Sequence, residues 1–207
     1  SSERLVEKIE ETRGVLLLSV RAGNSSDNLL ERVMDDFDDF SETLKKKNEK
    51  YLYKSSLIGS LGNQFAFTDL NSDMVSLSDF MGDYLYVDVW ATWCKPCKHE
   101  SLLFEKLQEQ FSVNDDLKFI SVSIDKEVDK WKGFRRNSPS SVEQFHFGAK
   151  GDFIDFYDIG SLPRFILLNR TGHVVDADAI RPSNPNTASY LDSLLEEALF
   201  DVQGNNY

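Results

Sequence analysis

The sequence contains few cysteines and prolines and no long apolar run, and each shortage excludes something. Two cysteines among 207 residues cannot staple distant segments together, so the fold must be stabilised by its core. No run approaches the roughly 18 apolar residues that a membrane-spanning helix needs. The opening Ser1-Ser2-Glu3 has no charged and then apolar leader, so we expect no signal peptide in this chain. No proline precedes Pro96, which favours uninterrupted elements in the first half.

Positive charge is also scarce. The chain has 23 basic and 35 acidic residues and a net charge of −12. Nucleic acids and anionic membranes require a basic surface, so we expect neither as a partner. Hydrophobic residues make up 41% of the chain and aromatic residues 12%, which is enough for a folded core. The length and composition predict one domain, or one domain with an appendage.

Both cysteines lie in the motif Trp93-Cys94-Lys95-Pro96-Cys97. Structural zinc needs four ligands, and this motif provides two. Covalent haem attachment needs Cys-x-x-Cys-His, whereas Lys98 follows Cys97. We therefore predict no metal and no cofactor. Thiol redox chemistry is favoured over an inert buried pair, provided that the motif joins a strand to a helix.

The flanking residues predict that context. Residues 84–92 are aromatic, β-branched and almost continuously apolar, as expected of a central strand buried on both faces. A helix is expected from Lys95, with Pro96 in its first turn. Cys94 would then lie at the helix N-terminus, where the helix dipole stabilises a thiolate, and Cys97 would be close enough for a reversible disulfide. The helix is expected to bury one apolar face, made of Leu102, Leu103, Leu107 and Phe111.

The run from Val87 to Cys97 resembles the active-site strand of thioredoxin-fold oxidoreductases. The wider pattern resembles the TlpA/ResA-like branch, which is related to the AhpC/TSA proteins, and the resemblance covers roughly residues 59–201. Its other matching pieces are Val75–Phe80 with Gly82, Phe119–Asp125, Gly160–Pro163, Phe165–Asn169 and Gly172. It implies a thioredoxin-like α/β fold in which helices sandwich a mixed β-sheet. A β-hairpin, from residues 65–70 and 74–77, is expected to precede the active-site strand.

The first 56 residues lie outside this resemblance. Apolar residues recur at three- and four-residue steps between residues 27 and 54, which predicts a long helix. Residues 14–20 fit either a helix or a strand. We predict a helical appendage over residues 1–56 and a thioredoxin-like domain over residues 57–207. The appendage could pack on the domain or serve a partner.

Disulfide exchange needs a proton carrier, and two acidic residues are candidates. Asp88 lies within the apolar strand, where lost hydration should raise its pKa towards neutrality. Glu100 follows Cys97 by one helical turn. The resemblance implies that Asp88 carries the proton of the second cysteine and that a glutamate at the position of Glu100 lies near the active site. Either residue could be the main carrier.

The resemblance also implies a substrate groove. Pro163 corresponds to a cis-proline beside the dithiol, and the main chain of Leu162 would pair with an extended substrate. Trp93, Lys95 and Pro96 complete the expected substrate-binding set. Arg164 replaces a threonine common in relatives, and we expect it either to influence substrate preference or to point to solvent.

The favoured function is a thiol–disulfide oxidoreductase that reduces protein disulfides through a mixed disulfide on Cys94, resolved by Cys97. The resemblance implies a periplasmic or otherwise extracytoplasmic location and a membrane-bound electron donor. One alternative is a peroxiredoxin-type thiol peroxidase, although Val87 and Ala91 stand where that family has proline and threonine. Another is a non-catalytic binding module. The sequence predicts no oligomeric state.

Overall fold

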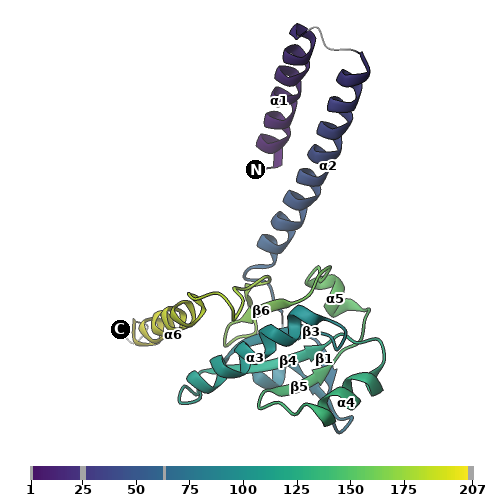
Figure 1. Cartoon of the computed structure of the whole chain (residues 1–207). Helices are drawn as coiled ribbons and strands as arrows, with labels where there is room; N and C mark the ends of the chain where they lie inside the picture. Colours follow the sequence, from purple (N-terminus) through teal and green to yellow (C-terminus); the bar gives the residue numbers. More distant parts are fainter. Residues whose placement is uncertain (1, 24–26, 63, 205–207) are drawn as a thin grey trace. The chain divides into compact units, whose positions relative to one another are not determined.

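The computed structural model describes residues 2–23, 27–62 and 64–204 and divides into two compact units (Figure 1). The first unit is Ser1–Tyr53 and the second is Lys54–Tyr207. Within the described residues, no helix is both long and apolar enough to cross a membrane.

The N-terminal unit is a helical hairpin made of α1 (Ser2–Ala22) and most of α2 (Asp27–Leu57). The two helices lie side by side and run in opposite directions (Figure 1). An ion pair of 2.9 Å between Arg13 Nε and Asp38 Oδ1 joins them. The predicted helix over residues 27–54 is confirmed. Residues 14–20 are helical: Leu16, Leu17 and Val20 are half-buried, whereas the other side chains of this stretch are exposed.

The second unit is built on a seven-stranded mixed sheet in the order β2-β1-β5-β4-β3-β6-β7. Strands β3, β4 and β5 are parallel to one another, and the remaining pairs are antiparallel. The strands are β1 (Ala66–Thr68), β2 (Met74–Ser76), β3 (Tyr84–Trp90), β4 (Leu117–Ser123), β5 (Glu143–His146), β6 (Arg164–Leu168) and β7 (Val174–Asp176). This arrangement confirms the predicted thioredoxin-like mixed sheet.

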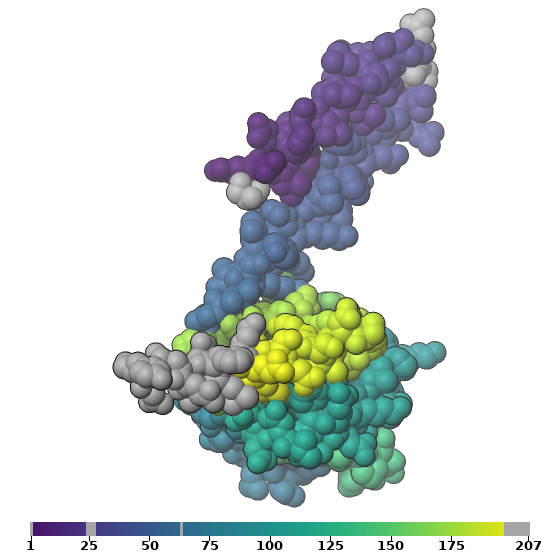
Figure 2. Space-filling view, turned by 90° about the vertical axis from the view of Figure 1, so that its left-hand side faces the viewer, coloured from purple at the N-terminus to yellow at the C-terminus, as the bar shows by residue number. Residues whose placement is uncertain are grey.

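Helices cover both faces of this sheet. On one face, α3 (Lys95–Gln110) and α6 (Thr187–Gly204) lie next to each other over a cluster that includes Tyr86, Phe104 and Leu191 (Figure 2). On the other face, α4 (Val128–Asn137) and α5 (Asp152–Phe156) pack on a cluster that includes Val87 and Trp131. Between the two layers, every residue of β3 from Leu85 to Trp90 is buried.

The predicted hairpin before the active-site strand is also confirmed. Strands β1 and β2 pair antiparallel and extend the sheet beyond β5, and a short 3₁₀ helix, η1 (Leu77–Phe80), follows. The Asp69 carboxylate accepts hydrogen bonds from the backbone N–H groups of Asn71 and Asp73, both 2.8 Å long. This side chain therefore closes the turn that the sequence indicated.

The predicted buried face of α3 is partly wrong. Leu102 is 61% exposed, and the face turned to the sheet instead carries Cys97, Glu100, Phe104 and Leu107. These residues follow the three- and four-residue spacing of one helical stripe. The sequence interpretation missed this stripe because it assigned the buried face from leucines and Phe111 alone and considered Glu100 only as a candidate proton carrier. Glu100 is buried because its carboxylate is hydrogen-bonded, as described below.

Candidate active site

The two cysteines lie where β3 passes into α3. Cys94 is the N-cap residue of α3, and the Cys97 N–H donates a hydrogen bond of 3.2 Å to Cys94 Sγ. Pro96 occupies the first turn of α3, where backbone N–H groups have no partner within the helix, so the absent proline N–H costs no hydrogen bond. A disulfide joins Cys94 and Cys97, so the predicted proximity of the sulfurs is confirmed. Cys94 is 4% exposed and Cys97 is 0% exposed, so Cys94 is the more accessible of the two residues.

The predicted substrate-binding residues gather at the same end of the sheet. Trp93 is 69% exposed, and Lys95 and Pro96 are exposed beside it. The Leu162–Pro163 peptide bond is cis, as predicted. In the antiparallel register of β3 and β6, Val89 lies opposite Arg164, so the amino end of β6 adjoins the carboxyl end of β3. The topology therefore brings the cis-proline next to the turn that leads to Cys94.

Asp88 is a completely buried carboxyl group in the centre of β3. Its Oδ2 accepts hydrogen bonds from Ser121 Oγ at 3.0 Å and from Ser101 Oγ at 3.2 Å. Its Oδ1 has no hydrogen-bond partner among the described residues. Burial raises the pKa of Asp88 to about 7, against the opposing effect of the two serine hydrogen bonds. Since Ser101 lies one turn after Cys97 on α3, the carboxyl group faces the helix next to the buried sulfur.

Glu100 is also buried, but both of its carboxylate oxygens have partners. Oε1 accepts a hydrogen bond of 2.6 Å from Ser183 Oγ, and Oε2 accepts one of 3.0 Å from Ser183 N–H. The side chain therefore ties the second turn of α3 to the segment that precedes α6. Unlike Asp88, Glu100 has both oxygens occupied.

Asp125 is a residue of this region to which the sequence interpretation gave no role. It is 1% exposed, and its carboxylate accepts hydrogen bonds from Thr92 N–H (2.9 Å), Thr92 Oγ1 (2.7 Å) and Ser123 Oγ (2.7 Å). Thr92 lies two residues before Cys94, so Asp125 fixes the turn between β3 and α3. The available signal was an acidic residue two positions after the end of β4, a strand parallel to β3, at the edge where the carboxyl ends of the strands meet.

Arg135 is a second residue that the sequence interpretation missed. This buried side chain from α4 places its guanidinium carbon 4.2 Å from the centre of a Trp90 ring. Burial lowers the pKa of Arg135, and the negative charge of Asp88 opposes that effect. The same attraction favours the ionised form of Asp88. Two opposing effects therefore act on the pKa of Asp88: burial in the strand raises it, and the positive charge of Arg135 lowers it.

Arg164 does not point to solvent. Its side chain is 4% exposed, and its Nε lies 3.2 Å from Asp178 Oδ1. Its Nη1 donates a hydrogen bond of 3.2 Å to the carbonyl of Ala177. Of the two expectations for Arg164, the solvent-facing one is therefore wrong, because the strand that follows the cis-proline is buried along its whole length. An influence on substrate preference stays a prediction.

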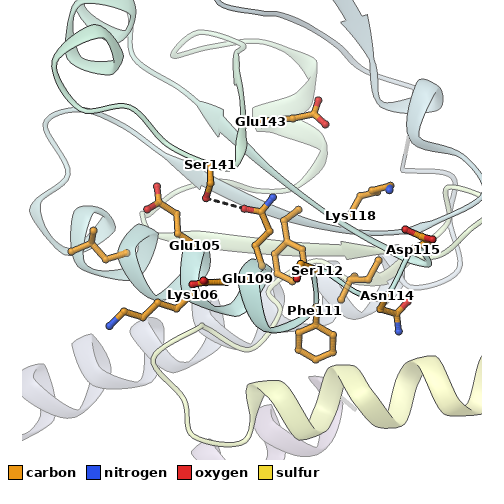
Figure 3. Close-up of a pocket in the computed structure, with 14 residues that line it drawn as sticks. Glu105, Lys106, Glu109, Phe111, Ser112, Asn114, Asp115, Lys118, Ser141 and Glu143 are labelled. Carbon is orange, nitrogen blue, oxygen red and sulfur yellow. Dashed lines mark hydrogen bonds between the residues drawn. The ribbon is translucent and has the colours of Figure 1, made fainter.

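A hollow of about 820 Å³ lies away from the dithiol, between the C-terminal half of α3 and strands β4 and β5 (Figure 3). Polar and charged side chains surround it, among them Glu105, Lys106, Glu109, Lys118 and Glu143. None of the predicted site residues lines it. Across the part of the chain that the structure describes, no group of three or more His, Cys, Asp or Glu side chains could hold a metal ion.

The fold and the Cys-x-x-Cys disulfide at the start of α3 define a thioredoxin-fold dithiol oxidoreductase. Comparisons with known proteins agree. A family model described as Thioredoxin-like matches residues 82–174. The thiol–disulfide oxidoreductase ResA of a Bacillus cereus strain is 28% identical over 123 residues, which is 58% of this chain and 68% of ResA.

Solved structures extend the likeness. One is a crystal structure from Bacteroides vulgatus, described as a thiol-disulfide oxidoreductase. Its sequence is 33% identical to this chain, and the TM-score is 0.62. The match covers 66% of this chain and 96% of the Bacteroides chain. A solution structure from the same organism has the same description. Its sequence is 40% identical to this chain, and the TM-score is 0.59. The match covers 64% of this chain and 86% of the Bacteroides chain. The chain belongs to the TlpA/ResA-like family of thioredoxin-fold thiol–disulfide oxidoreductases.

We expect Thr92→Val to loosen the turn before Cys94. The change keeps the shape of the side chain but removes one hydrogen bond to the buried Asp125 carboxylate, which should cost about 1.5–3 kcal/mol of unfolding free energy. Denaturation by urea, followed by tryptophan fluorescence, measures this loss. Disulfide exchange with oxidised glutathione should slow in parallel.

Thr92→Ser is the matched control, since it keeps the hydroxyl group and should retain stability and exchange rate. If Thr92→Val matched the unaltered protein in both measurements, Asp125 would not be needed to hold the turn.

Proposed function

We propose that this chain reduces disulfide bonds of protein substrates. The Cys94 thiolate attacks one sulfur of the substrate disulfide, forming a mixed disulfide and releasing one substrate thiolate, which takes up a proton. The Cys97 thiolate then attacks Cys94 Sγ, releases the second substrate sulfur and leaves the Cys94–Cys97 disulfide. The observation that carries the proposal is the position of Cys94 at the α3 N-terminus, with Cys97 within bonding distance.

Asp88 is the proton carrier in this scheme. The Cys97 thiol must lose a proton before it can resolve the mixed disulfide, and the group receiving that proton must titrate near the working pH. The pKa of Asp88, raised to about 7 by burial, meets this condition. Its free Oδ1 supports the same role, because a proton acceptor needs an unoccupied lone pair.

Glu100 acts as an anchor in the same proposal. Its two bonds to Ser183 leave its carboxylate oxygens engaged and support a positioning role for α3. The pH dependence described below distinguishes proton transfer by Glu100 from proton transfer by Asp88.

The substrate groove is proposed to run over Trp93, Lys95 and Pro96 and along the backbone of Leu162 and Pro163. The high exposure of Trp93 supports it, since a tryptophan left open to water beside a reactive sulfur can pack against a bound peptide. An extended substrate segment could pair with the main chain ahead of β6.

We further propose that residues 57–207 form the redox domain and residues 1–56 an appendage to it. A location outside the cytoplasm and a membrane-bound electron donor fit the family to which the chain belongs. Both are proposals that rest on that membership.

The dithiol mechanism predicts opposite behaviour for the two serine variants. Cys97→Ser should accumulate a mixed disulfide between Cys94 and a substrate sulfur, because nothing resolves it. Cys94→Ser should form no such adduct and should lose disulfide reduction. Mass spectrometry of non-reduced samples detects the adduct. A binding module would instead keep its activity in Cys94→Ser.

The direction of electron flow has its own test. A reductant should have a Cys94–Cys97 reduction potential near the value of about −270 mV found in thioredoxin rather than the value of about −120 mV found in the oxidant DsbA. Equilibration with glutathione redox buffers measures this potential. A value near the second figure would reverse the proposed direction.

Asp88→Asn should slow the resolving step by about 100-fold and remove the ionisation near pH 7 from the pH–rate profile. It should also stabilise the oxidised protein at high pH. In the native protein the pKa of Asp88 is raised to about 7, so between pH 4 and pH 7 the folded state holds a proton that the unfolded state has lost. Stability therefore falls as the pH rises through this range.

The rise from 3.8 to about 7 corresponds to about 4 kcal/mol. The unfolding free energy of Asp88→Asn, minus that of the unaltered protein, should grow by about this amount between pH 4 and pH 8. Asp129→Asn, at an exposed position, is the control and should show no such growth. A rate profile that keeps its ionisation near pH 7 in Asp88→Asn would assign the proton transfer to another group, with Glu100 the next to substitute.

A further inference from the structure

The N-terminal unit buries little of its apolar surface. Among its described apolar side chains, only Ile9 is buried. Several large apolar side chains are 40–69% exposed, namely Val6, Val15, Leu18, Leu29, Phe40 and Tyr51. Two helices in one hairpin share a single seam, and a segment of this size seldom forms a stable core by itself. A further surface is therefore needed to cover the hairpin.

The helix α2 presents two neighbouring stripes. The first faces α1, since its side chains are buried or half-buried along the length of the hairpin: Leu30, Met34, Phe37, Ser41 and Asn48. The second lies one step around the helix and consists of Val33, Asp36, Phe40, Leu44, Lys47 and Tyr51. Its residues repeat at three- and four-residue steps, the spacing of a helix–helix contact. Val33 and Leu44 are half-buried at the border with the first stripe. The other four residues of the second stripe are exposed, with Phe40 at 59% and Tyr51 at 68%, so α1 leaves most of this stripe uncovered.

The charges of α2 differ in their dominant sign on the two sides of residue 43, with Arg32 and Glu49 as the exceptions. The acidic residues Asp35, Asp36, Asp38, Asp39 and Glu42 precede it, and the basic residues Lys45, Lys46, Lys47 and Lys50 follow it. Of these, Asp38 is paired with Arg13 of α1, and Glu42 Oε1 lies 3.5 Å from Lys46 Nζ of the same helix. A parallel pairing of two α2 helices would place like charges together, whereas an antiparallel pairing places each acidic stretch beside a lysine stretch.

We propose that the second stripe of α2 binds the same stripe of a second copy of this chain, antiparallel and with a two-fold axis near residue 42. This register places Asp36 beside Lys47 of the second copy and Phe40 beside Leu44 of the second copy. It also places Val33 beside Tyr51 of the second copy. The two hairpins together form a four-helix bundle, in which the exposed apolar side chains of α2 become core residues.

A second copy accounts for the stripe better than an unrelated partner does. A two-fold rotation brings the apolar residues of one stripe against those of the other copy, and the same rotation brings acidic residues against lysines. One closed contact therefore buries the apolar side chains and pairs the charges. The inference uses only the N-terminal unit and is independent of the redox chemistry.

A charge-swap experiment on the full chain tests the pairing, with sedimentation equilibrium as the measurement. Asp36→Lys sets two lysines against each other, and Lys47→Glu sets two carboxylates against each other. By symmetry each change alters two contacts, and each should raise the dimer dissociation constant about tenfold. The double variant Asp36→Lys/Lys47→Glu restores opposite charges and should return to within about twofold of the unaltered chain.

Glu31→Lys is the matched control. It makes the same charge change at an exposed position on the opposite side of α2, about half a helical turn away from the stripe, and should leave the dimer unchanged. Circular dichroism should show the same helix content in every variant.

Cysteine pairs test the register. In a Cys94→Ser/Cys97→Ser background, Asp36→Cys/Lys47→Cys should form a disulfide-linked dimer on oxidation. Within one chain these positions are about 16 Å apart along the helix, too far for a bond. Asp36→Cys alone should not cross-link, since a two-fold axis near residue 42 separates the two copies of position 36 by about 18 Å.

Three results would overturn the proposal. A monomer at every concentration would mean that the stripe serves another partner or none. Ready cross-linking of Asp36→Cys alone would indicate a parallel pairing. A double charge variant as weak as the single ones would show that positions 36 and 47 do not meet.

Discussion

The burial of β3 on both faces is the constraint on which the rest of the active site depends. From Leu85 to Trp90 every residue is buried, so polar groups on or beside this strand depend on partners within the protein; among the described residues, Asp88 Oδ1 and Trp90 Nε1 have none. Ser101 and Ser121 supply them for Asp88, Asp125 supplies them for Thr92, and Ser183 supplies them for Glu100. Each of these bonds also fixes a piece of the turn or helix that holds the cysteines. The hydrophobic core therefore positions the dithiol by forcing its polar neighbours into single arrangements.

The same burial creates a conflict between stability and chemistry. A carboxyl group with one unpartnered oxygen in an apolar strand destabilises the folded state once it ionises. The positive charge of Arg135 reduces the cost of ionising Asp88, and the Arg135 guanidinium stacks on the Trp90 ring in the buried region. A carboxylate fully paired in a salt bridge would be more stable but would titrate far below neutral pH. The partial compensation seen here keeps the pKa of Asp88 near 7, where a proton can be both taken and given.

Much of this arrangement could be predicted from the sequence, because the information lay close to the cysteines. The strand, the helix start, the sulfur pairing and the cis conformation at Pro163 depend on contiguous residues or on a familiar family pattern. Asp125 and Arg135 could not be assigned, since each acts on the site through a contact made by a different strand or helix. Leu102 and Arg164 were misjudged for the same reason: their exposure depends on which neighbour covers them. Local spacing fixes the period of an element, whereas the identity of its buried face depends on the other elements that pack against it.

The two units differ in how they bury their apolar side chains. The sheet of the second unit is covered by helices on both faces and can satisfy its core within one chain. The hairpin has one layer and one seam, so every apolar side chain beyond that seam faces water unless another surface arrives. The distribution of charge indicates which kind of surface that is. Most acidic residues of α2 precede residue 43 and most basic residues follow it, so few of them can form ion pairs one turn apart as Glu42 and Lys46 do. This separation agrees with the dipole of α2 itself, and it also favours a contact in which the blocks of two helices run in opposite directions. The charge pattern of α2 therefore suits its own helix and is at the same time complementary to another α2 running in the opposite direction, while its exposed apolar side chains are covered only by such an assembly.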